Sequence, residues 1–210
     1  MLHVQKMPDS KPAYIERLVK YIPTEAAEGV YDYLKTHRVH LKIKKPRLTK
    51  LGDYRQPFKD KGHRISVNND LNKFAFLITL VHEMAHLETF TQHQNRKQPH
   101  GAEWKTNFKL LIAPFIELGI FPTNVLNALT KYMKNPAASS CVDVGLSEVL
   151  RSYNALQHQT VSDIALGQEF TLKNGKRFKK GEQLRKRFKC LCLDDKRMYF
   201  VSPLAEVKKE

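Results

Sequence analysis

The stretch Leu80-Val81-His82-Glu83-Met84-Ala85-His86 lies inside the longest regular apolar segment of the chain, from Leu71 to about Thr91. This segment contains no Gly or Pro, and its dense apolar residues predict a largely buried helix. A spacing of four residues places His82 and His86 on one face of that helix, one turn apart. Two imidazoles in this arrangement can hold a single metal ion, for which zinc is the expected identity.

Glu83 directly follows the first of these histidines, so its carboxylate is expected to lie beside the metal. In that position a carboxylate polarises a metal-bound water and accepts its proton. Two unliganded imidazoles and a carboxylate would be costly to bury in an apolar helix. We therefore predict one catalytic Zn²⁺ ion, with His82 and His86 as ligands and Glu83 as the catalytic base.

A catalytic zinc site also needs a third protein ligand and an open position. His93 lies two turns beyond His86, and about 10.5 Å of helix rise places it too far from the same ion. His100 follows a polar loop and Pro99, which allow the chain to reverse, and Gly101 after it permits close backbone approach. We therefore predict His100 as the third ligand. Glu103 is an alternative ligand, although a supporting or capping role near the start of the next helix fits it better.

The segments around this helix predict a mixed α+β fold. Helical periodicity begins near Lys11 and is interrupted at Pro23, and a further helix begins near Ala102. Short strands are expected at three places: Val39 to Lys45, Arg47 to Tyr54, and Arg64 to Asn68. We expect the residues Asn68, Asn69 and Asp70 to cap the apolar helix.

Several of these segments together resemble the SprT-like family, which includes the protease Spartan. They are Lys50-Leu-Gly-Asp-Tyr-Arg55, Ile65-Ser-Val-Asn68, Leu80-Val-His-Glu-Met-Ala-His86 and His100-Gly-Ala-Glu-Trp-Lys105. The resemblance covers about residues 20 to 115. It implies a zincin-like fold with His82, His86 and His100 on zinc and Glu83 as base. It also implies a zinc-dependent endopeptidase that acts on protein substrates, among them proteins associated with DNA.

Beyond Ser162 the pattern changes to short alternating segments, which predict a small antiparallel β module of three or four strands. The expected organisation is a metallopeptidase domain at residues 1–135, a connecting segment at 136–161 and a basic β module at 162–210. SprT-like proteins often carry a C-terminal zinc ribbon with two Cys-x-x-Cys pairs. Here only Cys141, Cys190 and Cys192 occur, and even with His158 as a fourth ligand nothing but the count supports a metal site. We expect a degenerate ribbon without metal, with the cysteines in its core.

The chain is strongly basic, with 36 Lys and Arg against 21 Asp and Glu and a formal net charge of +15. Nine basic residues lie between Lys173 and Lys189, and seven between Lys35 and Lys50. In the first run, Phe178 and Phe188 either stack on nucleobases or face the core of the module. We predict DNA or another nucleic acid as a partner; the alternative is a solvated basic surface. The candidate contacts are Lys176, Arg177, Lys179, Lys180, Arg185, Lys186 and Arg187.

Other features limit the class of protein. No apolar stretch approaches the roughly 18 to 20 residues of a membrane span, and the first residues lack the pattern of a secretory signal. Three cysteines do not form a disulfide framework. We therefore expect a soluble cytoplasmic protein with no membrane partner. The alternative to a peptidase is a non-catalytic, zinc-stabilised protein that binds nucleic acid or acts in transcription, and hydrolysis of a non-peptide bond is a third possibility.

Overall fold

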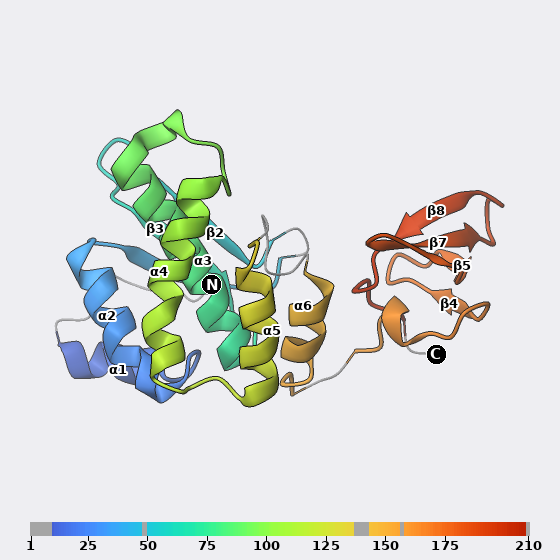
Figure 1. Ribbon diagram of the computed structural model, residues 1–210, viewed down its shortest axis with the longest axis horizontal. Helices are drawn as coiled ribbons and strands as arrows, with labels where there is room; N and C mark the ends of the chain where they lie inside the picture. Colours follow the sequence, from blue (N-terminus) through green and yellow to red (C-terminus); the bar gives the residue numbers. More distant parts are fainter. Residues whose placement is uncertain (1–9, 48–49, 137–142, 156–157, 209–210) are drawn as a thin grey trace. The chain divides into compact units, whose positions relative to one another are not determined.

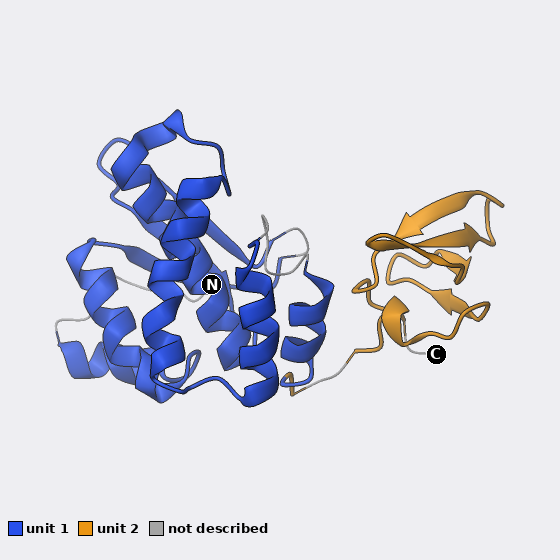
Figure 2. Ribbon diagram, in the orientation of Figure 1, with its two compact units in different colours: residues 1–153 blue, residues 154–210 orange. Residues whose placement is uncertain are grey.

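The computed structural model describes residues 10–47, 50–136, 143–155 and 158–208. The chain divides into two compact units, residues 1–153 and residues 154–210, which Figure 2 shows in different colours. Residues 143–153, part of the expected connecting segment, group with the first unit. Most of the expected boundary at residues 135–141, including Cys141, lies outside the described residues. The functional limits at 135 and 162 stay a prediction.

A three-stranded sheet forms one layer of the first unit, with the order β1-β3-β2. The central strand β3 (Arg64–Asn68) runs parallel to β1 (His40–Lys44) and antiparallel to β2 (Gly52–Arg55). Four of the five residues of β3 are buried, whereas β2 is an edge strand that contacts the long central helix α3 (Lys73–His93). The arrangement confirms the predicted mixed α+β class and places one sheet edge beside α3 (Figure 1).

The helix α3 corresponds to the predicted apolar helix from Leu71 to about Thr91. It is buried over most of its length because the sheet covers one side and other helices cover the other. Its N-cap is Asn72, whose side-chain oxygen accepts a hydrogen bond from the N–H of Ala75 at 3.0 Å. The expected cap at Asn68–Asp70 is therefore wrong. The amide of Asn68 is instead buried and donates to the carbonyl oxygen of Lys50 at 3.0 Å.

The remaining helices of the first unit surround α3 and the sheet. The interruption at Pro23 is confirmed, since α1 (Lys11–Leu18) and α2 (Ala27–Thr36) lie on either side of it. The predicted helix from Ala102 is α4 (Ala102–Glu117), which packs against α3 and continues past Pro114. Two helices that the sequence analysis did not predict, α5 (Thr123–Met133) and α6 (Val144–Arg151), pack against each other. Single 3-10 turns occur at Thr24–Ala26, Gln94–Arg96 and Val161–Asp163.

The second unit is a five-stranded antiparallel sheet, one strand more than the largest number expected. The segment from Leu184 to Leu193, expected as one strand, is two strands that pair with each other around Arg185, whose φ is 50°. The strands are β4 (Glu169–Thr171), β5 (Arg177–Lys179), β6 (Gln183–Leu184), β7 (Arg187–Cys192) and β8 (Met198–Val201). Cys190 and Cys192 lie in its core with Phe170, Phe178, Val161 and Val201.

No helix in the described parts of the chain combines the length and the apolar character that a membrane span requires.

Candidate metal centre

Three histidines, two from the helix α3 and one from the loop that follows it, converge in the first unit. His82 and His86 lie one turn apart on α3, and His100 lies just before α4. One ligand atom from each of the three side chains lies within 4.8 Å of the other two. Among the described residues this is the one group of three or more His, Cys, Asp and Glu side chains that could hold a metal ion.

The spacing of the rings fits ligands that share one ion. The Nε2 atoms of His82 and His100 are 3.2 Å apart. Two imidazole nitrogens at about 2.0–2.1 Å from one tetrahedral ion lie roughly 3.3 Å from each other. The ring centroids of His86 and His100 are 4.5 Å apart, and the rings are nearly perpendicular at 80°. The three nitrogen donors therefore fit a borderline-soft ion such as Zn²⁺.

Trp104 packs against all three imidazoles from the first turns of α4. Its ring centroid lies 4.5 Å from that of His82, 5.5 Å from that of His86 and 4.7 Å from that of His100. Its indole N–H donates to the carbonyl oxygen of His82 at 3.4 Å. The Nδ1 atom of His82 is buried and has no hydrogen-bond partner among the described residues. Packing against Trp104, rather than a hydrogen bond from Nδ1, therefore sets the orientation of the His82 ring.

Burial keeps the three imidazoles neutral, which is the form that binds a metal. Desolvation and the neighbouring histidines lower the pKa of His82 from 6.5 to about 2. The pKa of His86 falls to about 4 for the same two reasons. The pKa of His100 is also lowered, by burial alone. At neutral pH the cluster therefore offers unprotonated nitrogen atoms to a cation.

The loop before α4 presents His100 through an uncommon backbone conformation. The φ angle of His100 is 61°, in the left-handed region that non-glycine residues rarely adopt. Gly101 was expected to permit a close approach of the backbone, and its φ is an ordinary −68°. What Gly101 supplies is room, because a Cβ atom there would lie 3.0 Å from the carbonyl oxygen of Gln98. The strain at His100 is of the kind that concentrates at functional sites.

Glu83 points from α3 towards the edge strand β2. Its carboxylate accepts a hydrogen bond from the backbone N–H of Tyr54. It also lies directly against Gly52, where an added Cβ atom would overlap the Oε1 atom of Glu83. Burial, followed by the negative charge of Asp53, raises the pKa of Glu83 from 4.5 to about 8. The carboxylate of the residue that follows His82 on α3 is thus held in place by a strand that is distant in sequence.

The residues that hold Glu83 were missed as functional residues by the sequence analysis. The segment from Lys50 to Arg55 was used for the family resemblance and as part of an expected strand, and no functional role was assigned to Gly52 or Tyr54. The available signal was a glycine inside a short predicted strand, because such a glycine often marks the close approach of another group.

The two other acid and histidine candidates lie outside the cluster. Glu103, weighed as an alternative ligand, forms an ion pair with Lys97 at 2.6 Å in the first turn of α4. Hydrogen bonds from Lys97 and from its own backbone lower the pKa of Glu103. His93 is the last residue of α3 and does not belong to the converging group. The structure therefore favours the capping alternative for Glu103.

The predicted nucleic-acid contacts lie in the second unit, and one of them is not on its surface. Lys180 is buried, with an exposed fraction of 6%, and its Nζ atom donates to the carbonyl oxygens of Ser162 at 3.2 Å and Ile164 at 2.5 Å. Including Lys180 among the surface contacts was wrong, because its charge is used inside the unit. The other six candidates are exposed: Lys176, Arg177, Lys179, Arg185, Lys186 and Arg187.

Comparison with known proteins bears on the first unit. The model of the SprT-like family matches residues 15–115, which confirms the resemblance stated from the sequence motifs. The matched range contains the three converging histidines and Glu83, and it excludes the second unit. No curated protein and no solved structure matches the chain.

Proposed function

We infer from residues 15–115, which form a domain of the SprT-like family, that this chain is a zinc-dependent metalloendopeptidase. The observation that carries the proposal is the convergence of His82, His86 and His100. Glu83 follows His82 directly on α3, and the backbone N–H of Tyr54 holds its carboxylate. A catalytic zinc site has three protein ligands and one open position, and a carboxylate near the metal serves as the base. Structural zinc sites are instead closed by four protein ligands. Among the described residues no fourth ligand joins the three histidines.

Each residue of the site has a part in this proposal. The three histidines would hold the ion, and Trp104 keeps their rings in place by packing. Bound zinc supplies a Lewis acid that brings the pKa of a water ligand close to neutral. Glu83 would accept the proton of that water and later deliver it to the leaving amine. The N–H of Tyr54 orients the carboxylate for both transfers.

The raised pKa of Glu83 is compatible with this role. In the absence of a cation, burial keeps the carboxyl group largely protonated at neutral pH, because its pKa is about 8. A divalent cation next to the carboxyl group favours its ionised form and lowers the pKa. A base whose pKa lies near the working pH is the most effective catalyst of proton transfer.

We propose proteins as the substrates, among them proteins bound to DNA. The support for this substrate class is the net charge of +15, which attracts a polyanion and would concentrate the enzyme where such substrates lie. The net charge is an argument for substrates located on DNA, but it carries no information about which peptide bond is cleaved.

The test combines metal content with cleavage of a fluorescently labelled, denatured protein. Wild type, Glu83→Gln and His100→Ala are purified and their bound zinc is measured. We expect one zinc ion per wild-type chain and per Glu83→Gln chain, and loss of zinc in His100→Ala. Cleavage should occur in wild type and fall by at least about 10²-fold in Glu83→Gln.

The matched control is His93→Ala, which removes the histidine at the end of α3 that lies outside the cluster. It should retain both zinc and cleavage. Full activity of Glu83→Gln would remove Glu83 from the mechanism. One zinc ion without cleavage of any protein, with or without DNA, would instead favour the non-catalytic nucleic-acid-binding alternative.

A further inference from the structure

The sheet of the second unit has one buried face and one open face. On β7 the even-numbered residues Cys190 and Cys192 are fully buried, whereas Arg187 and Lys189 are exposed. Lys189 pairs with Phe200 of β8. Because residues that pair directly lie on the same face, Phe200 belongs to the open side.

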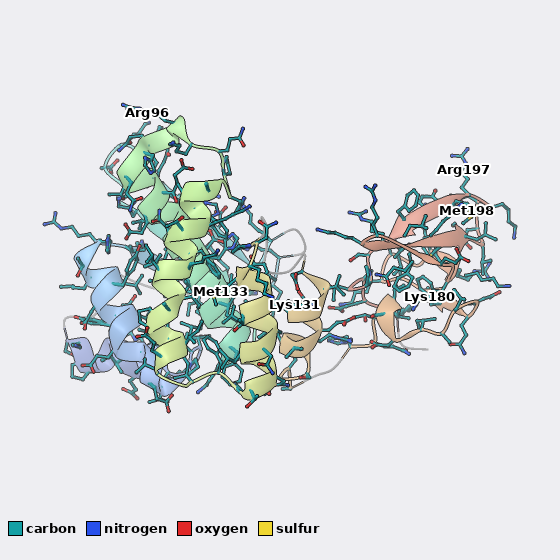
Figure 3. All side chains as sticks on the ribbon, viewed as in Figure 1. Arg96, Lys131, Met133, Lys180, Arg197 and Met198 are labelled. Atoms are coloured by element: carbon teal, nitrogen blue, oxygen red, sulfur yellow. The ribbon has the colours of Figure 1, made fainter. Side chains whose placement is uncertain are left out.

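The open face carries apolar and basic side chains next to each other. Phe200 is 58% exposed, Met198 is 50% exposed and Leu184 is 45% exposed. Cross-strand pairs place two of these side chains beside cationic ones, Phe200 beside Lys189 and Leu184 beside Arg187. Met198 pairs with Leu191, whose partner on the other side is Lys179. We call this surface the open sheet face, defined by Lys179, Leu184, Arg187, Lys189, Met198 and Phe200. Figure 3 shows the Met198 side chain on this unit.

The cations of the open sheet face have no acidic partner within the described residues. No ion pair there involves Lys179, Arg187 or Lys189, and Arg187 donates one hydrogen bond, to the carbonyl oxygen of Phe200 at 3.4 Å. Arg177, the next outward residue of β5, is instead paired with Asp194 at 3.1 Å. Two acidic residues are strand neighbours of these lysines. Glu169 is the cross-strand partner of Lys179, and the backbone carbonyl oxygen of Glu182 accepts a hydrogen bond from the backbone N–H of Lys189. Arg185 and Lys186 add two more exposed cations at the β6–β7 turn.

The aromatic residues that the sequence singled out are not the ones that are accessible. Phe178 is buried with an exposed fraction of 3%, and the Nζ atom of Lys180 lies 4.0 Å from the centre of the half-buried ring of Phe188. Both rings face the core side of the sheet, where Phe178 packs against Phe170. The accessible ring is Phe200, on a strand outside the basic run from Lys173 to Lys189.

We propose that the open sheet face binds single-stranded nucleic acid, with Phe200 as a stacking platform for a base and Lys179, Arg187 and Lys189 as phosphate contacts. Unpaired cations select a polyanion, and an exposed ring flanked by them selects a polyanion with free base faces. A duplex keeps its base faces inside its own stack and cannot offer them to Phe200. The proposal rests on the second unit alone and does not depend on the peptidase activity.

The ring is tested by fluorescence anisotropy of the full-length chain with labelled oligo(dT) at fixed salt. Phe200→Ala should weaken binding by at least about fivefold, since one stacked base contributes ~1–3 kcal/mol. Phe200→Tyr should restore binding, because it keeps the aromatic face, whereas Phe200→Leu should not. Phe58→Ala is the matched control, since Phe58 is an exposed ring of the first unit with an exposed fraction of 66%.

The charges are tested by the salt dependence of the same binding. The double variant Lys179→Gln, Lys189→Gln should reduce the slope of log K against log salt by about 1.4, because each phosphate contact on a single strand contributes about 0.7. Lys131→Gln is the control for charge, since Lys131 is an exposed lysine of α5 in the first unit.

Three outcomes would overturn the proposal. The first is wild-type affinity of Phe200→Leu or Phe200→Ala for oligo(dT). The second is equal binding of oligo(dT) and a duplex of the same length. The third is binding to vesicles containing phosphatidylserine without binding to oligo(dT), which would assign the face to a membrane surface. All ring variants should keep wild-type zinc content and wild-type cleavage without DNA, so failure here is distinguishable from failure of the proposed function.

Discussion

At the scale of single residues, Gly52 determines where the Glu83 carboxylate can lie. A methyl group at position 52 would occupy the space of that carboxylate. We predict that Gly52→Ala displaces Glu83 and lowers kcat/KM for protein cleavage by at least about tenfold, while the three histidines still bind zinc. Overpacking should also lower the free energy of unfolding by roughly 1–3 kcal/mol. Zinc analysis, kinetics and urea denaturation measure the three effects.

Gly62→Ala is the matched control for this substitution. A Cβ atom at position 62 meets only the carbonyl oxygen of Arg38, at an ordinary contact distance of 3.8 Å. It should therefore leave kcat/KM and unfolding close to wild type. Wild-type kinetics of Gly52→Ala would show that Glu83 does not need its present position.

The histidine cluster should make the stability of the metal-free protein depend on pH. The folded-state pKa values of His82, His86 and His100 are lowered, so these groups take up protons only on unfolding as the pH falls below 6.5. Glu83 acts in the opposite direction, because its raised pKa contributes stability that is lost as the pH rises through about 8. The three histidines outnumber Glu83, so the unfolded state binds more protons than the folded state between pH 6.5 and about 5. Acidification over this interval should therefore lower the urea midpoint of the metal-free protein.

The comparison variant for this prediction is His86→Gln, which removes one of the three protons taken up on unfolding. Its urea midpoint should fall less than that of wild type over the same pH interval. An equal fall in both proteins would mean that other groups cause the pH dependence. Both proteins are studied after removal of metal, because a bound cation would itself hold the imidazoles unprotonated.

The sequence could predict the residues on α3 and not those that meet them. The spacing of His82 and His86 within a helix is fixed by helix geometry alone, and His100 followed from the loop that returns the chain. The contact between Glu83 and Gly52 depends on how an edge strand packs on a helix that begins more than 20 residues later. That contact is a tertiary property, and no local pattern encodes it.

At the scale of secondary-structure elements, the start of α3 depends on Asn72. Its side chain caps the helix through the N–H of Ala75 and also donates to the carbonyl oxygen of Leu150 at the end of α6, at 2.7 Å. Asn72→Ala should therefore lower the free energy of unfolding by about 1–2 kcal/mol. Thermal and urea denaturation of the two proteins measure the difference.

Asp70→Ala provides the control for the cap. Asp70 is a residue that the sequence marked as a capping candidate, but it is exposed and lies outside the helix. Its replacement should change the free energy of unfolding by less than about 0.5 kcal/mol. If Asp70→Ala lowered the free energy of unfolding more than Asn72→Ala, the assignment of Asn72 as the cap of α3 would be wrong.

Elements with a strong local signal were predicted and those with a weak one were not. The apolar run of α3 and the alternation in β1 were sufficient, whereas the amphipathic α5 was overlooked in a segment with no motif. The break between β6 and β7 depends on Arg185, which adopts a positive φ although nothing in its residue type favours one. A side chain in a tight turn of this kind is held by the pairing of the strands on either side.

At the scale of the whole molecule, the second unit has its own small core and an internal cation. Lys180 donates to two carbonyl oxygens of the segment before β4, and its Nζ atom lies over the ring of Phe188. Lys180→Met would leave both carbonyl oxygens without this donor, so it should destabilise the second unit by about 2–3 kcal/mol. Hydrogen exchange should accelerate in residues 158–208 and not in α3.

Lys179→Met is the neighbouring control, since Lys179 is the residue before Lys180 and its side chain is exposed at the end of β5. It should leave hydrogen exchange in both units unchanged. Faster exchange throughout α3 in Lys180→Met would mean that the two compact units do not unfold separately.

The two thiols on β7 become accessible to reagents only when the sheet of the second unit unfolds. Cys190 and Cys192 are fully buried, and the described part of the first unit contains no cysteine. Burial also raises the pKa of the Cys190 thiol, which slows its reaction further. In a chain with Cys141→Ser, an alkylating dye can therefore couple only when the C-terminal sheet comes apart. The rate of dye coupling then measures how often this sheet opens in the folded protein.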